Sequence, residues 1–210
     1  MANLSLAPHE PHTIQTRGIT LLRAGHRAVR RLKRQQLEPS LHGNKVWNSS
    51  FLIMDHLAEQ NILNSAHVMD VGCGWGPLAV FAAHRFGCRV TAIDADADVL
   101  PYVALHCDIN QVKVTTRKAR FEHITQQQLS DVNLLVGADI CFWDELTPVL
   151  YNLIRRALRA GVSQIVIADP GRSPFYALAE RCQKHLNAEI VERQSDDPRQ
   201  ICADLLVIRN

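Results

Sequence analysis

Several features that mark membrane, secreted or nucleic-acid-binding proteins are missing from this sequence. No stretch approaches the roughly 20 consecutive apolar residues of a membrane span, and the N-terminus lacks the apolar core of a signal peptide. The net charge of the 210 residues is only +2, which is too small by itself to indicate a nucleic-acid partner. We therefore expect a cytoplasmic protein that binds neither membranes nor nucleic acid.

The patterns of a metal site are also lacking. The sequence contains six cysteines, but no C-x-x-C pair occurs and no two histidines have the familiar zinc spacing. The cysteines are scattered over apolar segments, as is typical of reduced core residues in a cytosolic protein. We therefore predict no metal centre.

Apolar runs of strand length alternate with helix-length segments through most of the chain. Because such alternation favours right-handed crossovers, it predicts an α/β fold with a doubly wound, mostly parallel sheet. The last two strands have no helix between them, which favours an antiparallel C-terminal hairpin. The expected strands are 68–71, 90–93, 113–116, 133–136, 164–168, 190–192 and 203–208, and the expected helices are 46–60, 77–86, 96–110, 143–159 and 175–186.

The N-terminal part differs from this pattern, so we divide the chain into residues 1–45 and a main domain of residues 46–210. Residues 1–16 are expected to be a mobile tail. Residues 18–36 are expected to form a helix with six basic residues and no acidic one. Its charged face is either a solvated surface or a docking surface for an acidic partner.

The most informative segment, residues 67–76, leads from an apolar strand into a helix. Asp70 stands before three glycines at alternate positions, Gly72, Gly74 and Gly76, and Asp94 ends the next apolar run. Glycines at such a turn let the backbone approach a ligand closely, because they have no Cβ. A carboxylate at the end of the second strand can accept the hydroxyl groups of a ribose. Together these residues predict a nucleoside-binding crevice.

The spacing indicates which nucleoside derivative binds. Dinucleotide sites use G-x-G-x-x-G, whereas this loop reads D-x-G-x-G-x-G. Asp70 would repel a pyrophosphate but suits a ligand that carries an ammonium and a sulfonium. The alternative is a glycine-rich turn with an incidental aspartate. The segment resembles motif I of the class I, seven-strand methyltransferases that use S-adenosylmethionine (SAM).

This resemblance implies the seven-strand Rossmann-like fold, SAM as cofactor and S-adenosylhomocysteine (SAH) as product. It implies cofactor contacts at Trp47, Asp70, Gly72, Cys73, Gly74, Gly76, Asp94, Ala95, Phe121 and Ala138. Many relatives place an acid against the adenine after the third strand. This chain has Arg120 near that place, so either Glu122 or the backbone together with Phe121 would contact the adenine.

A second informative segment, residues 137–145, follows the fourth predicted strand. Four of its side chains could surround an amine, because aromatic faces attract cations and carboxylates orient an ammonium. These four are Asp139, Phe142, Trp143 and Glu145. The alternative is that Asp144 caps the following helix while the aromatic residues belong to the core.

Asp139-x-x-Phe142 fits the Asp/Glu-x-x-Tyr/Phe motif of the seven-strand protein-lysine methyltransferases, although the family often has Tyr in place of Phe142. Within that group, residues 137–145 and 169–172 resemble the enzymes that act on the electron transfer flavoprotein β subunit. The resemblance implies catalytic roles for Asp139, Phe142, Trp143 and Glu145, and a protein partner such as an electron transfer flavoprotein subunit. We therefore predict N-methylation of protein lysines. The alternatives are a small-molecule methyltransferase and an inactive interaction protein with the same fold.

Overall fold

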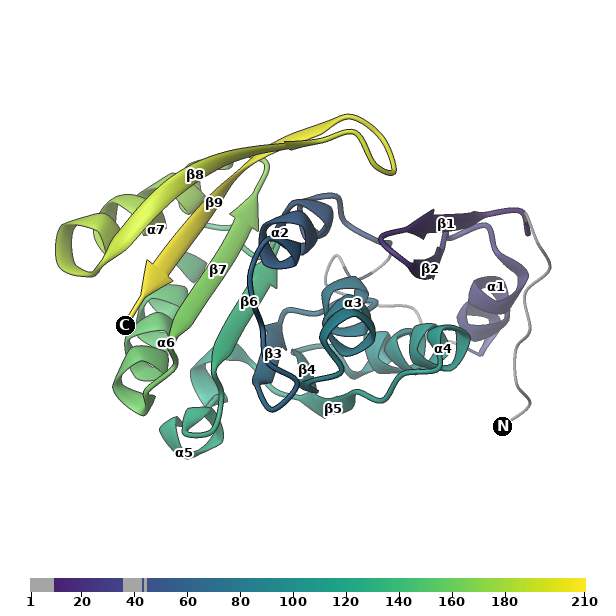
Figure 1. Ribbon diagram of the computed structural model, residues 1–210, viewed down its shortest axis with the longest axis horizontal. Coiled ribbons are helices and arrows are strands. Elements are labelled where there is room, and N and C mark those ends of the chain that lie inside the picture. Colours follow the sequence, from purple (N-terminus) through teal and green to yellow (C-terminus); the bar gives the residue numbers. More distant parts are fainter. Residues whose placement is uncertain (1–9, 36–42, 44) are drawn as a thin grey trace.

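A mixed seven-stranded sheet forms the centre of the protein. The computed structural model describes residues 10–35, 43 and 45–210. The strand order is β5-β4-β3-β6-β7-β9-β8, and β9 alone runs in the direction opposite to the other six strands (Figure 1). The predicted fold is confirmed. In chain order the strands are β3 (His67–Val71), β4 (Arg89–Asp94), β5 (Thr115–Lys118), β6 (Leu134–Ala138), β7 (Gln164–Asp169), β8 (Ala188–Ser195) and β9 (Ile201–Arg209).

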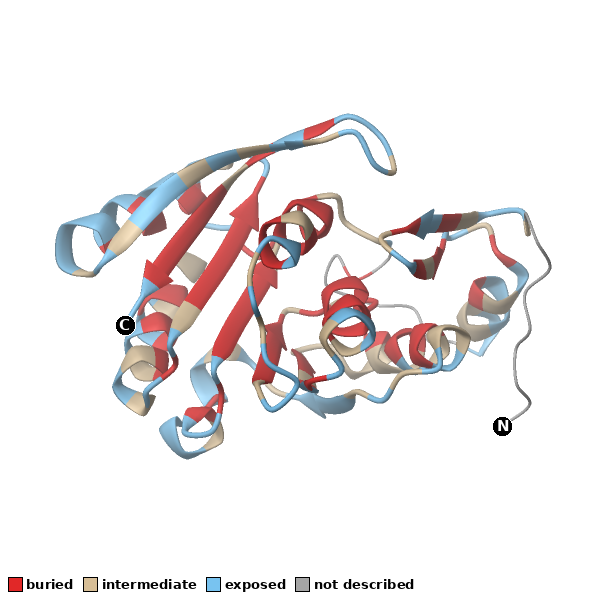
Figure 2. Cartoon of the chain, in the orientation of Figure 1, coloured by how far each residue is buried: buried red, intermediate tan, exposed pale blue. Residues whose placement is uncertain are grey.

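Helices cover both faces of the sheet, so its central strands are buried on both sides (Figure 2). Successive residues of a strand point to opposite faces. Accordingly, Val68 packs in the cluster that contains α2 and α3, whereas Met69 packs in the cluster that contains α6 and α7. The first group is α2 (Ser49–Ala58), α3 (Pro77–Phe86) and α4 (Leu100–Asn110), and the second is α5 (Gln126–Leu129), α6 (Leu146–Ala160) and α7 (Ser173–His185). Two short 3₁₀ helices, η1 (Ala97–Val99) and η2 (Phe121–His123), complete the connections.

The strand order places a crevice between β3 and β6. From β3 the chain moves outward through β4 and β5, and then crosses back to β6 and β7 on the other side. Ligands of open α/β sheets bind at such a switch point, outside the carboxyl ends of the strands. The glycine loop after β3 and residues 139–145 after β6 therefore face the same crevice.

The structure of the N-terminal segment differs from two of the predictions. A hairpin of β1 (Thr13–Thr16) and β2 (Ile19–Leu22) precedes a shorter helix, α1 (Arg27–Arg34). The predicted helix over 18–36 is therefore wrong in its first part, and residues 10–16 are not a tail; residues 1–9 and 36 lie outside the described residues. Arg17 and Gly18 both have positive φ, 50° and 79°, which allows a two-residue turn and the pairing of strands on either side.

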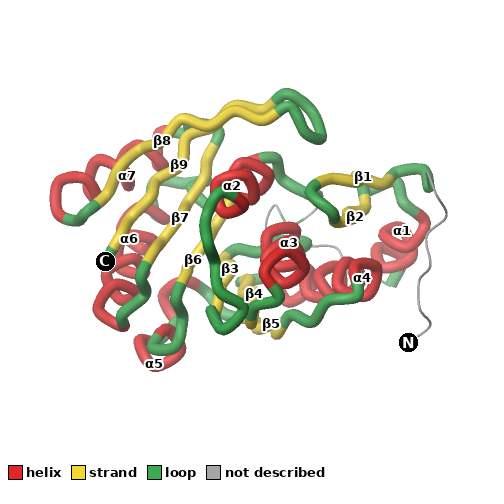
Figure 3. The backbone as a smooth tube through the Cα atoms, viewed as in Figure 1, coloured by secondary structure: helices red, strands yellow, loops and turns green. Residues whose placement is uncertain are grey.

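The hairpin packs at the end of the molecule formed by α3 and α4 (Figure 3). The backbone N–H of Leu22 donates to Nε2 of the buried His106, at 2.9 Å, and His106 Nδ1 lies 2.9 Å from the carbonyl oxygen of Tyr102. Burial lowers the pKa of His106 to about 4, so the ring is neutral at pH 7. Tyr102 in turn stacks on Trp75 of the glycine loop, with ring centroids 4.9 Å apart. The division of the chain after residue 45 stays a prediction.

Candidate functional site

Backbone geometry explains the glycines of the loop after β3. Gly72 has φ of 67°, and a Cβ there would lie 2.6 Å from Cγ2 of Ile140. Gly74 has φ of 51°, and a Cβ there would meet no atom within 4 Å, so this position is open. Gly76 has φ of 74° and is the N-cap of α3, and a Cβ there would lie 2.9 Å from Cγ1 of Val103. A side chain would strain all three positions, because L-residues rarely adopt positive φ.

Two carboxylates flank this loop. Asp94 Oδ2 accepts the backbone N–H of Gly74, and its Oδ1 accepts that of Asp96, both at 2.9 Å. Asp70 is 1% exposed and accepts the backbone N–H of Ala79 at 3.2 Å. Burial raises the pKa of Asp70 to about 7, and burial also raises the pKa of Asp94. Burial thus favours the neutral form of both carboxyls in the ligand-free protein, and a cationic ligand beside them would favour the ionised form.

A cavity of about 310 Å³, which we call the donor cavity, lies at the carboxyl ends of β3, β4 and β6. A small pocket of about 20 Å³ adjoins it beside the glycine loop and contains Asp70 and Cys73 in its lining. Nine of the ten predicted cofactor contacts line one or both spaces, and Gly76 lines neither. Phe121 and Glu122, the two side chains considered for contact with the adenine, both line the donor cavity, as does Arg120.

Asp139 stands at the other end of the donor cavity, directly after β6. It is 5% exposed and has φ of 55°, a conformation that aspartate tolerates better than most residues. Its Oδ2 accepts the backbone N–H of Ser49 at 3.2 Å, and its Oδ1 accepts Nη1 of Arg172 at 3.2 Å. Arg172 Nη1 also donates to Oδ2 of the buried Asp169 at 2.7 Å. The predicted carboxylate is therefore fixed by two partners distant in sequence.

The aromatic residues of the site surround Arg172. The guanidinium carbon lies 4.3 Å from the ring centroid of Phe142 and 5.9 Å from that of Trp47. The rings of Phe142 and Trp47 meet edge to face at 5.4 Å. Arg172 belongs to the segment 169–172 that supported the resemblance, but the sequence did not place it in the site. An arginine of the chain thus occupies the cation position that we expected an amine to occupy.

The remaining predicted catalytic residues are more exposed. Trp143 is 46% exposed and lines the donor cavity, whereas Glu145 is exposed and lines no described cavity. Glu145, not Asp144, is the N-cap of α6, and its side chain makes no capping hydrogen bond. The capping role considered for Asp144 is therefore wrong, and a catalytic role for Glu145 stays a prediction.

A second cavity, of about 440 Å³, shares Trp47 and Asp139 with the donor cavity. The start of α2, the loop after β7 and the loop between β8 and β9 contribute to its lining. Sequence reasoning missed this cavity, because its walls come from segments far apart in the chain. Among residues 10–35, 43 and 45–210, no cluster of three His, Cys, Asp or Glu side chains is placed to hold a metal ion. Over the same residues, no helix is long and apolar enough to span a membrane.

Comparisons with known proteins agree with this geometry. A family model described as a methyltransferase domain matches residues 68–161. An electron transfer flavoprotein β subunit lysine methyltransferase of Xenopus laevis is 29% identical over 119 residues, which cover 57% of this chain and 48% of the relative. This chain spans about half the length of the curated lysine methyltransferases it matches.

A different kind of relative matches a shorter part. A ubiquinone biosynthesis O-methyltransferase of Xanthomonas campestris is 36% identical over 75 residues, which cover 36% of this chain and 31% of the relative. Among solved structures, that of M. capricolum TrmK in complex with S-adenosyl-homocysteine has a TM-score of 0.54 at 14% identity. The structural match covers 75% of this chain and 67% of the TrmK chain, and it shows that the two share a fold.

Proposed function

We propose that this chain is a class I SAM-dependent methyltransferase, and that it transfers the methyl group of SAM to the side-chain amine of a protein lysine. One observation carries the proposal. The carboxylate of Asp139, in its Asp-x-x-Phe motif, lies where the donor cavity meets the second cavity. That junction is where an acceptor amine and a methyl donor would meet.

The residues of the donor cavity fit SAM. Asp94 and Asp70 provide negative charge beside a backbone with no side chain in the way at Gly74, and Phe121 provides an aromatic surface. We expect Asp94 to accept the ribose hydroxyls and Asp70 to favour the cationic part of the ligand. When bound, SAM supplies a methyl group on a cationic sulfur, and SAH remains as the product.

The pairing of Arg172 with Asp139 suits an amine that must attack in its neutral form. A free lysine has a pKa of about 10.4, so its amine must lose a proton before it can attack. A bare carboxylate would raise that pKa, but the cationic Arg172, 3.2 Å from Asp139, offsets this effect. Asp139 and Phe142 would position the amine after its proton has passed to water. Its lone pair would form the new C–N bond as the bond between the methyl carbon and the sulfur breaks, which leaves SAH. Positioning of this kind is worth up to about 7–11 kcal/mol of the barrier.

The test is transfer of label from SAM to protein. The purified chain is incubated with radiolabelled SAM and candidate proteins, with an electron transfer flavoprotein β subunit first because the relatives named above act on it. Label recovered as N-methyllysine supports the proposal. SAM binding measured by calorimetry, together with no labelled lysine in any protein, contradicts it.

The likeness to ubiquinone biosynthesis O-methyltransferases favours a second candidate, a methyltransferase acting on a small molecule. Matches to such enzymes cover 36% to 60% of this chain, and those to the lysine methyltransferases cover 57% and 65%. The same incubation separates the two candidates, because label found only in the small-molecule fraction supports the second. Absence of SAM binding would instead indicate an interaction protein with a methyltransferase fold.

A further inference from the structure

The charges of the second cavity are unbalanced. Among the described residues, three cations line it, Lys45, Arg172 and Arg199, and the one lining carboxylate is that of Asp139. Asp139 is already paired with Arg172, which also pairs with Asp169. Two cations therefore remain to face whatever enters the cavity.

Neither of these two cations has an acidic partner among the described residues. The ammonium of Lys45 lies 4.0 Å from the ring centroid of Trp47, and no described carboxylate forms an ion pair with it. Arg199 is exposed, and no described residue forms an ion pair or hydrogen bond with its guanidinium. Cations converging on a cavity without counter-charges favour an anionic ligand.

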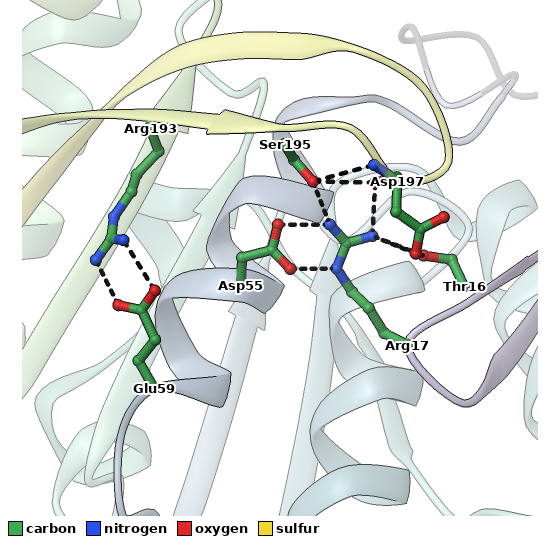
Figure 4. A network of polar contacts seen from close by, with 7 residues as sticks. All are labelled: Thr16, Arg17, Asp55, Glu59, Arg193, Ser195 and Asp197. Atoms are coloured by element: carbon green, nitrogen blue, oxygen red, sulfur yellow. Dashed lines mark hydrogen bonds and ion pairs between the residues drawn. The ribbon is translucent and has the colours of Figure 1, made fainter.

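The loop that carries Arg199 is held in place by a network around Arg17 (Figure 4). The side chain of Arg17 is 9% exposed, and its Nε and Nη2 donate to the two carboxylate oxygens of Asp55 at 2.6 Å. Nη1 donates to the carbonyl oxygen of Asp197 and Nη2 to Oγ of Ser195, both at 2.8 Å. Arg17 thus joins the β1–β2 turn and α2 to the loop between β8 and β9. The wall near Arg199 is therefore fixed before any ligand arrives.

We propose that the second cavity binds the methyl acceptor, and that the acceptor is a lysine flanked by acidic residues whose carboxylates pair with Lys45 and Arg199. The inference rests on the proposed protein-lysine activity and adds to it the class of target segment. The acceptor amine would reach the donor cavity at Asp139, the residue that both cavities share. Flanking arginines or lysines would be repelled by the same cations.

The test uses three synthetic peptides with a single lysine and glutamate, glutamine or arginine on both sides of it. Methylation of each is measured with labelled SAM at low salt. We expect KM to be lowest for the acidic peptide, about fivefold below the neutral one, because two exposed ion pairs contribute modestly. Raising the ionic strength should reduce this preference.

Charge reversal identifies the cation responsible. The variant Arg199→Glu should lose the preference for the acidic peptide and gain activity on the arginine peptide, with SAM affinity unchanged in calorimetry. Arg199 lines the second cavity but not the donor cavity, so it is a cleaner target than Lys45, which also borders the glycine loop. The matched control is Arg159→Glu, an exposed arginine in the last turn of α6, which should keep the preference of the unmodified chain.

Failure of this inference differs from failure of the proposed function. Equal KM values for the three peptides, or an acidic preference that survives in Arg199→Glu, overturn the inference and leave lysine methylation in place. If neither a peptide nor a protein is methylated while a small carboxylate is, both the inference and the proposed function are wrong. A preference that Arg199→Glu abolishes and Arg159→Glu keeps supports both.

Discussion

The donor half and the acceptor half of the site are built in different ways. Around the glycine loop, backbone groups make the contacts over short stretches of chain, as in the bond from Gly74 N–H to Asp94, 20 residues later. On the acceptor side, side chains make contacts over long stretches: Asp139 reaches Ser49 across 90 residues, and Arg17 reaches Asp197 across 180. The glycine loop and its two carboxylates therefore come from one continuous segment, β3 to β4, whereas the acceptor half is assembled from segments far apart in the chain.

This difference suggests that the two halves can change independently. Substitutions around the second cavity alter side chains that do not hold the glycine loop, so they should change acceptor binding while leaving SAM binding intact. Substitutions at the two acids of the donor half should do the reverse. A variant that changed both SAM binding and acceptor binding would contradict this independence.

The largest effect is expected at Asp139. The variant Asp139→Asn keeps the size of the side chain and a residue type that tolerates positive φ, but removes the charge that holds Arg172. Because positioning of the acceptor amine is lost, kcat should fall about a hundredfold. SAM affinity, measured by calorimetry, should change little.

The neighbouring Asp144→Asn serves as the control, since Asp144 is exposed and lines neither cavity. It should keep normal turnover. Asp139 has no part in the mechanism if Asp139→Asn retains full kcat. The separation of the two halves breaks down if that variant also fails to bind SAM.

On the donor side, Asp94→Asn should weaken SAM binding and leave kcat at saturating SAM nearly unchanged. The substitution removes a charged acceptor of the Gly74 N–H and of the expected ribose hydroxyls, which is worth about 1.5–3 kcal/mol, or about 10- to 100-fold in Kd. Titration calorimetry measures it. Asp108→Asn, at an exposed position in α4, should bind SAM normally. An unchanged Kd in Asp94→Asn would remove Asp94 from the cofactor site.

The pH dependence of SAM binding should report on Asp70. Burial raises the pKa of its carboxyl to about 7, so about half of the ligand-free protein carries a neutral Asp70 at that pH. A cationic ligand favours the ionised form, so binding expels the proton and Kd falls as pH rises through 7. Between pH 8 and pH 6 we expect Kd to rise about tenfold. Asp70→Asn should give a flatter profile, whereas an equally steep profile in that variant would assign the titration to another group.

The difference between local contacts in the donor half and long-range contacts in the acceptor half also explains what could be predicted from the sequence. The bounds of α3, Pro77–Phe86, were predicted correctly because proline favours a helix start and glycine follows its end. The donor contacts were predictable because motif spacing fixes a local backbone shape. The second cavity was not, because its walls come together only after folding. The β1–β2 hairpin had a weak signal, an Arg-Gly pair between two short runs rich in β-branched residues, which the basic residues that follow obscured.

A smaller effect is expected where the N-terminal hairpin supports the acceptor side. Arg17 forms a bidentate ion pair with Asp55 of α2, and Arg193 forms one with Glu59, the residue that caps the end of α2, so the two arginines are a matched pair (Figure 4). Only Arg17 also holds the loop before Arg199. Arg17→Gln should therefore raise the acceptor KM about threefold, because the loop before Arg199 loses hydrogen bonds that are each worth about 0.5–1.5 kcal/mol.

Both variants should lower Tm, because each removes an ion pair between α2 and another element. Their kinetics separate the two roles, provided that rates are measured below both melting temperatures. Arg193→Gln should keep the acceptor KM of the unmodified chain, and neither variant should change the Kd for SAM. If both raise KM equally, general loss of rigidity explains the effect and the loop near Arg199 has no special role. If Arg17→Gln weakens SAM binding as well, the donor half depends on the N-terminal hairpin, by way of the contact between His106 and Leu22.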